Sequence, residues 1–304
     1  MRLKWLLKTA LRNRAANWAV RTALRPLLAH SRGRLWGREV PVVGTVPVAL
    51  PDGERIVLTT DGSDRLAWYF WWGGFDAYEP ETARLFRVLA RRCAVILDVG
   101  AYSGYFSLLA AQGNAEASVF AFEPVPRSHR ALMRNAAING ALNIVPQLLA
   151  VGDREGEVEL YLPDEGMPCE ASTLKRSRPA AQALRVMQVS LDSWLGQSGL
   201  DRVDLMKLDT EGTEHLVLRG AIGILEVHAP CIVCEVLDGH TENLLDEVLS
   251  PLGYRYFHIT DAGPTPATTI RADPSERLRN YLFCPCDALG AVREACEVCP
   301  VGPV

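Results

Sequence analysis

The sequence predicts an α/β fold built on a doubly wound, mostly parallel sheet. Between residues 94 and 284, short apolar runs of strand length alternate with segments of helical period, which is the order that builds βα units. The first run passes through Asp98 into a turn with two glycines, Gly100 and Gly104, and a helical stretch follows at once. In sheets of this type, ligands bind at turns that follow the carboxyl ends of strands.

The chain is long enough for one large domain with appended segments, since it has 304 residues of which 48% are apolar. We expect four parts along it. A basic amphipathic arm covers residues 1–40, lead-in strands with an aromatic and helical segment cover 41–92, the main domain covers 93–288, and a cysteine-containing tail covers 289–304.

The charges of the N-terminal arm are almost all basic, whereas acidic residues predominate in the rest of the chain. Residues 1–38 hold ten basic residues and no acid, which leaves 22 of the 32 basic residues against all 36 acidic residues in the remainder. The arm therefore either lies on an anionic membrane surface or docks on its own acidic domain. On a helical wheel, the apolar arc consists of Leu3, Leu6, Leu7, Ala10 and Leu11, opposite Lys4, Lys8 and Arg12.

The sequence of the arm indicates neither a membrane-spanning helix nor a cleaved signal peptide. The apolar stretch between Lys4 and Lys8 is three residues long, whereas a span needs ~20 residues and a signal core about 7. The net charge of −4 favours no nucleic-acid partner. We therefore expect a cytoplasmic protein, with the inner membrane surface as the place where a lipid-binding arm would hold it.

Residues 41–92 are expected to lead into the main domain. The alternation over 41–60 predicts two edge strands joined by the turn Pro51-Asp52-Gly53. Seven aromatic residues then crowd residues 68–78, ahead of a predicted helix over 82–92. We expect this aromatic cluster to pack between the arm and the domain.

The glycine turn and the next strand predict a nucleoside site. Residues 118–122 form an apolar run that ends in Glu123 and Pro124, and an acid about 20 residues after such a turn binds ribose hydroxyls. The turn departs from the dinucleotide pattern G-x-G-x-x-G because Tyr102, after Ala101, stands where the second glycine is required. It therefore suits S-adenosylmethionine better than NAD.

The middle of the chain continues the βα order. A helix over residues 126–139 ends at the cap signal Asn139-Gly140. A strand over 144–149 then delivers Ala150 and Val151 to the same sheet edge, where their backbone would meet the adenine. An insertion follows, and we expect it to carry the contacts that are specific to the substrate of this protein. It consists of a hairpin-like segment at 157–162, a polar loop through Ser172-Thr173-Leu174 and a strand at 186–189.

The strand over residues 204–209 carries the candidate catalytic groups. Alternation puts Lys207, Asp209 and Glu211 on one side of the strand. Asp209 is the first choice for a base that takes a proton from an acceptor hydroxyl; Glu211 and His215 follow it. The alternative role for Asp209 is to cap the next helix or to pair with Lys207. Three later strands, at 231–236, 254–259 and 281–283, bring the predicted sheet to seven.

The eight cysteines are expected to be thiols, because the chain shows no secretion signal. Cys231 and Cys234 lie on one strand and face opposite sides, so they do not chelate one ion easily. A C-terminal set offers a C-x-C pair that is tighter than structural zinc sites use. We therefore assign no metal site to this set, which consists of Cys284, Cys286, Cys296 and Cys299.

Four motifs in sequence resemble the FkbM family of S-adenosylmethionine-dependent methyltransferases, over residues 78–284. They are DVGAYSG, FAFEP, RNAAINGALNIVPQLLAVGDREGEVELY and LMKLDTEGTE. The resemblance implies a class I methyltransferase domain of Rossmann-like fold. It also implies S-adenosylmethionine as cofactor and methylation of a hydroxyl on a sugar, lipid or secondary metabolite.

The resemblance also implies roles for particular residues. The turn from Gly100 to Gly104 would receive the methionine part, Asp98 would orient it, and Glu123 with Pro124 would bind the ribose. Two other classes stay open: a nicotinamide oxidoreductase, which would need the missing G-x-G-x-x-G, and a non-catalytic membrane-surface interaction protein. A non-catalytic protein would be expected to have lost Asp98, Glu123 and Asp209.

Overall fold

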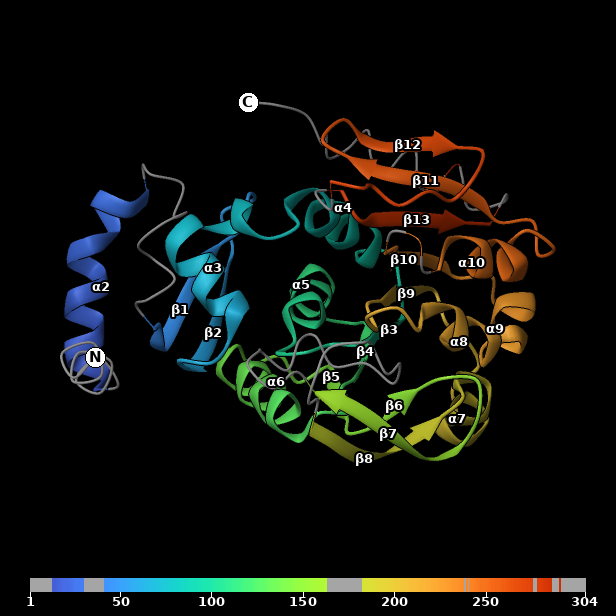
Figure 1. Cartoon of the computed structure of the whole chain (residues 1–304), viewed down its shortest axis with the longest axis horizontal. Helices are drawn as coiled ribbons and strands as arrows, with labels where there is room; N and C mark the ends of the chain where they lie inside the picture. Colours follow the sequence, from blue (N-terminus) through green and yellow to red (C-terminus); the bar gives the residue numbers. More distant parts are fainter. Residues whose placement is uncertain are drawn as a thin grey trace. The chain divides into compact units, whose positions relative to one another are not determined.

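A computed structural model describes residues 13–29, 41–162, 182–237, 239, 241–275, 278–285 and 290 (Figure 1). The chain divides into two compact units. Unit 1 comprises residues 1–80 and 133–140, and unit 2 comprises residues 81–132 and 141–304. Across the described residues, we find no helix with both the length and the apolar character that crossing a bilayer demands.

Unit 1 is built on a β-hairpin. Strands β1 (Val43–Ala49) and β2 (Arg55–Asp61) pair antiparallel, which confirms the predicted pair of strands and the turn between them. Helix α3 (Arg65–Gly73) follows, and the Asp64 carboxylate caps it by accepting a hydrogen bond from the Ala67 N–H at 3.1 Å. The short helix η2 (Phe75–Ala77) completes the aromatic segment.

Helix α2 (Arg14–Ala29) contacts the hairpin through polar side chains. The Asn17 amide donates to the Pro41 carbonyl at 2.6 Å and accepts from the Val43 N–H at 3.0 Å. Arg21 donates to the Thr45 carbonyl at 3.2 Å, and its guanidinium lies 3.9 Å from the centre of the Trp71 ring. Residues 1–12, with the predicted apolar arc, lie outside the described residues.

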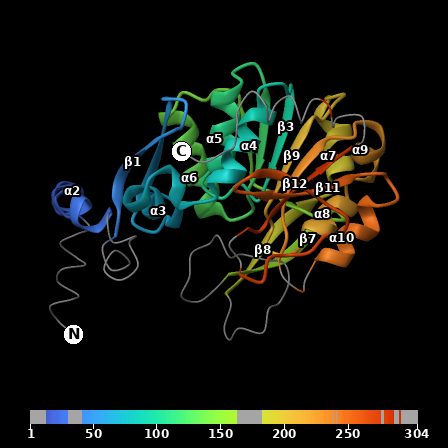
Figure 2. The same ribbon diagram turned by 90° about the horizontal axis from the view of Figure 1, so that it is seen from above.

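Unit 2 contains an eight-stranded sheet with the order β12-β11-β13-β10-β9-β3-β4-β5. The five strands from β10 to β5 run parallel, which confirms the doubly wound, mostly parallel class. Strand β13 pairs antiparallel with both β10 and β11, and β12 pairs antiparallel with β11. Figure 2 shows β3 and β9 side by side. The strands are β3 (Val95–Val99), β4 (Ser118–Phe122), β5 (Ile144–Gln147), β9 (Leu205–Leu208), β10 (Cys231–Glu235), β11 (Arg255–Thr260), β12 (Gly263–Ala267) and β13 (Asn280–Cys284).

The predicted number of seven strands is wrong, because β12 adds an eighth. Its sequence is GPTPA, and prolines at two of five positions argue against a strand within a sheet. Strand β12 lies at the sheet edge and pairs only with β11 among the described strands. An edge strand tolerates Pro264 and Pro266, whose missing N–H groups can face away from the neighbouring strand.

Helices cover both faces of this sheet, with α4 and α5 on one face and α7 to α10 on the other (Figure 1). On the second face, Leu97, Met206 and Leu208 belong to a buried core with Val217 and Leu218. Side chains alternate along a strand, so the intervening residues point to the α5 face. The helices are α4 (Pro80–Ala90), α5 (Tyr105–Gly113), α6 (Pro126–Ile138), α7 (Leu191–Ser198), α8 (Glu214–Arg219), α9 (Ile222–Val227) and α10 (Glu242–Leu249).

A second sheet of three strands corrects the predicted strand over 144–149. Strand β5 ends at Gln147, and the next two-residue strand, β6 (Ala150–Val151), pairs with β8 (Gln182–Val189) instead of continuing the main sheet. Strand β7 (Gly156–Leu162) occupies the predicted hairpin-like segment and pairs antiparallel with β8.

Several predictions lie outside the described residues. They concern the loop through Ser172-Thr173-Leu174, the cysteines Cys286, Cys296 and Cys299, and the tail beyond residue 290. No disulfide joins the four cysteines that the structure describes, Cys93, Cys231, Cys234 and Cys284.

Candidate functional site

The glycine turn follows β3 and is fixed by its neighbours on both sides. The N–H groups of Gly100 and Ala101 both donate to the Phe122 carbonyl at 3.0 Å, which ties the turn to the end of β4. Gly100 has φ +84°, and a Cβ there would lie 1.8 Å from the backbone carbonyl oxygen of Asp209. The turn therefore lies against the end of β9, and only glycine fits at position 100.

Two further residues of the turn adopt the left-handed conformation, Tyr102 with φ 50° and Gly104 with φ 87°. A tyrosine in this region is uncommon and is strained unless neighbouring groups hold it. Helix α5 begins directly after Gly104, so the unpaired N–H groups of its first turn lie at the same edge of the sheet.

Glu123 provides the group that holds Tyr102. Its Oε2 accepts from the Tyr102 N–H at 2.8 Å, and its Oε1 accepts from the Val125 N–H at 2.7 Å. The side chain is buried, and burial raises the pKa of this carboxyl to about 8 against the opposing effect of the two hydrogen bonds. A carboxylate offers about four acceptor sites, so the predicted ribose contact is compatible with this positioning role.

Asp98 and Lys207 are neighbours in the β3–β9 register and form a buried charged layer beneath the turn. Asp98 accepts from the Ser107 hydroxyl at 2.5 Å, and burial raises its pKa to about 6. The Lys207 side chain is 0% exposed, and its Nζ lies 4.8 Å from the centre of the Phe106 ring. Lys207 is therefore shielded from solvent, and it contacts groups of the protein.

The Lys207 ammonium lies 3.3 Å from Oδ2 of Asp209, directly after β9. The Asp209 N–H donates to the Val99 carbonyl at 3.0 Å, so the backbone of this residue is fixed against β3. Its side chain is 20% exposed, unlike that of Lys207. The two roles that the sequence suggested for Asp209, a catalytic base and the partner of Lys207, are therefore both compatible with this geometry.

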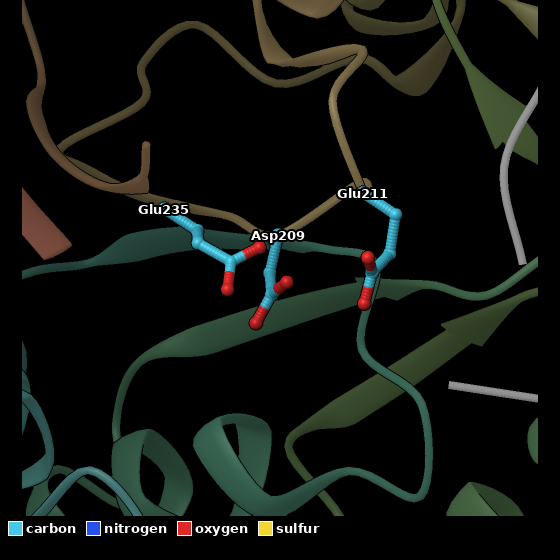
Figure 3. A group of neighbouring side chains, drawn as sticks. All are labelled: Asp209, Glu211 and Glu235. Atoms are coloured by element: carbon cyan, nitrogen blue, oxygen red, sulfur yellow. The ribbon is translucent and has the colours of Figure 1, made fainter. Parts of the chain in front are cut away.

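Three carboxylates meet at the ends of β9 and β10. One oxygen from each of Asp209, Glu211 and Glu235 lies within 4.8 Å of the others, and the three side chains point to the same side of the backbone (Figure 3). Glu211 has φ 57°, which is unusual for this residue type. Sequence reasoning missed Glu235, although an acid at the end of a predicted parallel strand is the signal that identified Glu123.

His215 is not part of this group. It lies in α8, and burial lowers its pKa first, followed by the charge of Arg219. The other charges that influence this pKa belong to Asp153 and Glu247. The neighbouring Glu214 instead fixes the loop after β9, because its Oε1 accepts from the N–H groups of Thr210 at 2.8 Å and Gly212 at 3.1 Å.

The structure thus brings together most of the residues predicted for a cofactor. Gly100 to Gly104, Asp98, Glu123 and Asp209 stand at the ends of three adjoining strands, β4, β3 and β9. Pro124 follows Glu123 and is partly exposed. Ala150 and Val151 are buried in the three-stranded sheet.

The chain is similar to known proteins over parts of its length. The family model described as "Methyltransferase FkbM domain" matches residues 98–256. Methyltransferase sdnD of Sordaria araneosa is 31% identical over 153 residues, which cover 41% of this chain and 59% of that protein. AMB antimetabolite synthetase AmbE of Pseudomonas aeruginosa is 30% identical over 183 residues, which cover 48% of this chain and 8% of that protein.

The matches thus span less than two thirds of either curated relative. Among solved structures, methyltransferase FkbM from Methylobacillus flagellatus is 18% identical, with a TM-score of 0.42. That match covers 63% of this chain and 43% of the other.

Proposed function

We propose that this chain, which belongs to the FkbM methyltransferase family, transfers a methyl group from S-adenosylmethionine to a hydroxyl group. The observation that carries the proposal is the contact between Glu123 and the glycine turn. An acid for ribose hydroxyls and a turn for the amino-acid part stand at the ends of adjoining strands, as a nucleoside with an attached amino acid requires.

The N–H groups of the first turn of α5 would bind the carboxylate of the methionine part. Those of Gly100, Ala101 and Tyr102 already donate to the Phe122 carbonyl and to Glu123 and so hold the shape of the turn. Glu123 would accept hydrogen bonds from the ribose hydroxyls, and the backbone at Ala150 and Val151 would meet the adenine. Asp98 would act indirectly, because it binds Ser107 in α5 and so positions the start of that helix.

Asp209 would prepare the acceptor. A bound sulfonium supplies an activated methyl group for in-line displacement, so the chain has to orient an acceptor oxygen and remove its proton. Asp209 is partly exposed at the edge of the sheet, and its ion pair with Lys207 holds the carboxylate in one orientation. Glu211 stands beside it as a second carboxylate.

The proposed acceptor is a hydroxyl of a sugar, a lipid or a secondary metabolite. The basic residues of segment 1–38 would add a contact with anionic membrane if the acceptor is presented there. No nucleic acid is part of this proposal, because the chain as a whole carries more acidic than basic residues.

Replacing Asp209 by asparagine tests the chemical part of the proposal. A positioned base contributes roughly 10²- to 10⁴-fold in rate, so Asp209→Asn is expected to reduce single-turnover methyl transfer by that factor with little change in cofactor affinity. The rate is measured with labelled S-adenosylmethionine and the acceptor that becomes labelled in an extract.

Asp201→Asn, at an exposed position in the same unit, is the matched control. If Asp209 only pairs with Lys207, Asp209→Asn would lower the melting temperature and leave the rate per folded molecule unchanged. That outcome would remove the base assignment.

A further inference from the structure

We propose that Asp209, Glu211 and Glu235, together with the amide oxygen of Asn280, form a binding site for a divalent cation. Carboxylate and amide oxygens are the ligands of hard cations such as Mg²⁺, Mn²⁺ and Ca²⁺. The four residues come from the ends of β9 and β10 and from the first position of β13, so the adjacent strands of the sheet hold them together.

The spacing of the three carboxylates fits a single ion. Their ligand oxygens lie within 4.8 Å of one another. Oxygens on opposite sides of Ca²⁺ are about 4.6 to 5.2 Å apart, and those around Mg²⁺ about 4.0 to 4.2 Å, as follows from their bond lengths. The cluster therefore accommodates the larger ion directly and the smaller ion after a slight closing of the side chains.

Asn280 gives an independent indication of a ligand. It is 3% exposed, and its Oδ1 has no hydrogen-bond partner among the described residues. Buried amide oxygens are nearly always satisfied in proteins, so a group in this state requires an explanation. A cation bound between Asn280 and the carboxylates provides one.

The strand register directs Asn280 toward the cluster. Glu235 and Asn280 are partners in the antiparallel β10–β13 pair. The next pair, Val236 and Arg279, carries the backbone hydrogen bond at 2.8 Å, so Glu235 and Asn280 form the intervening pair without hydrogen bonds. Their side chains therefore project from the same face with Cβ atoms about 4.5 to 5.5 Å apart.

Two basic side chains contact carboxylates of the cluster. Lys207 contacts Oδ2 of Asp209 at 3.3 Å, and Arg279 contacts Oε1 of Glu235 at 3.4 Å. Ionised carboxylates are the form that binds a metal. Among the described residues, Lys207 and Arg279 offset part of the charge of the three carboxylates, so we expect a dissociation constant of about 10⁻⁵ to 10⁻³ M, at the weak end of the scale that ligand charge sets.

The position of the cluster indicates a role for the bound ion in methyl transfer. This role rests on the proposed function. Asp209 lies against the glycine turn, so an ion at the cluster would stand beside the cofactor and could bind the acceptor oxygen. A bound cation lowers the pKa of a hydroxyl. The hydroxyl proton would pass to a carboxylate of the cluster while the C–O bond forms and the C–S bond breaks.

Binding of Mn²⁺ to the full-length protein without cofactor tests the site. The fraction of free ion is measured from its electron paramagnetic resonance signal. We expect one site in the stated range, a loss of tenfold or more in affinity for Glu235→Gln, and no change for Glu247→Gln, whose side chain is 64% exposed. Circular dichroism checks that each variant is folded.

Asn280→Asp provides a gain-of-function arm, which a misfolded protein cannot imitate. A fourth carboxylate at the site is expected to increase the affinity for Mn²⁺ by tenfold or more. Absence of Mn²⁺ binding to the wild type at millimolar concentration, or equal affinity in all variants, would overturn the proposal. Separate titration with S-adenosylhomocysteine distinguishes this failure from failure of the proposed function, because the cation test uses neither cofactor nor acceptor.

Discussion

Gly100→Ala is expected to abolish cofactor binding and to lower the free energy of unfolding of unit 2 by more than about 2 kcal/mol. The left-handed conformation alone costs a residue with a Cβ roughly 1 to 2 kcal/mol. At Gly100 the added Cβ would also lie 1.8 Å from the carbonyl oxygen of Asp209. Because that oxygen belongs to the backbone, the turn and the end of β9 have to separate, and this displaces the residues that are proposed to bind the cofactor.

Gly199→Ala is the matched control for this substitution. Gly199 has φ +74°, and a Cβ there would meet nothing within 4 Å. The control therefore carries the conformational penalty without the clash. Denaturant unfolding and calorimetric titration with S-adenosylhomocysteine measure the two effects, and a Gly100→Ala protein that binds as tightly as the control would show that the turn does not form the site.

Lys207→Met is expected to destabilise the protein by about 3 to 5 kcal/mol, the range measured when one partner of a buried ion pair is removed. Methionine keeps most of the volume of lysine but leaves Asp209 without its cation at 3.3 Å. Asp98 loses a favourable charge as well, because Lys207 lowers the pKa of this buried carboxyl. Both carboxylates would then be destabilised in the folded state.

An exposed ion pair in the same unit supplies the comparison for Lys207. Arg185 and Glu157 lie 3.7 Å apart with side chains 72% and 57% exposed. Arg185→Met is expected to change the free energy of unfolding by less than about 1 kcal/mol. Equal losses for the two variants in urea unfolding would mean that the charge layer beneath the turn contributes little to stability.

The part of the site that could be predicted from the sequence depends on short-range patterns. The turn at Gly100 and the acid at Glu123 each follow an apolar strand, and the parallel β3–β4 pairing then places them side by side. Alternation along one strand likewise anticipated that Lys207 and Asp209 share a face, and the structure pairs their side chains.

The rest of the fold and of the candidate site depends on contacts between segments that are far apart in the sequence. The strand at 231–236 was predicted, and Glu235 at its end has the same signal as Glu123, but its position beside Asp209 and Asn280 depends on the pairing of β10 with β9 and β13. The pairing of Ala150 with Gln188 in a second sheet has no local signal either. The amphipathic helix predicted from Leu3 to Arg12 lies outside the described residues. The contacts of α2 with the hairpin come from the polar residues Asn17 and Arg21.

The proposed function depends on the binding of S-adenosylmethionine by Glu123 and the glycine turn. The most direct measurement is calorimetric titration of the wild type and Glu123→Ala with S-adenosylhomocysteine and with NAD, between pH 6 and pH 9. We expect binding of S-adenosylhomocysteine but not NAD, and a roughly tenfold to hundredfold loss of affinity in the variant.

The affinity for S-adenosylhomocysteine is also expected to change with pH in one direction. Burial raises the pKa of Glu123 to about 8 in the free protein. Hydrogen bonds from ribose hydroxyls favour the ionised carboxylate, so the affinity of the wild type is expected to increase as the pH rises toward 8 and to level off above it. A wild type that does not bind S-adenosylhomocysteine, or a Glu123→Ala variant with unchanged affinity, would contradict the account.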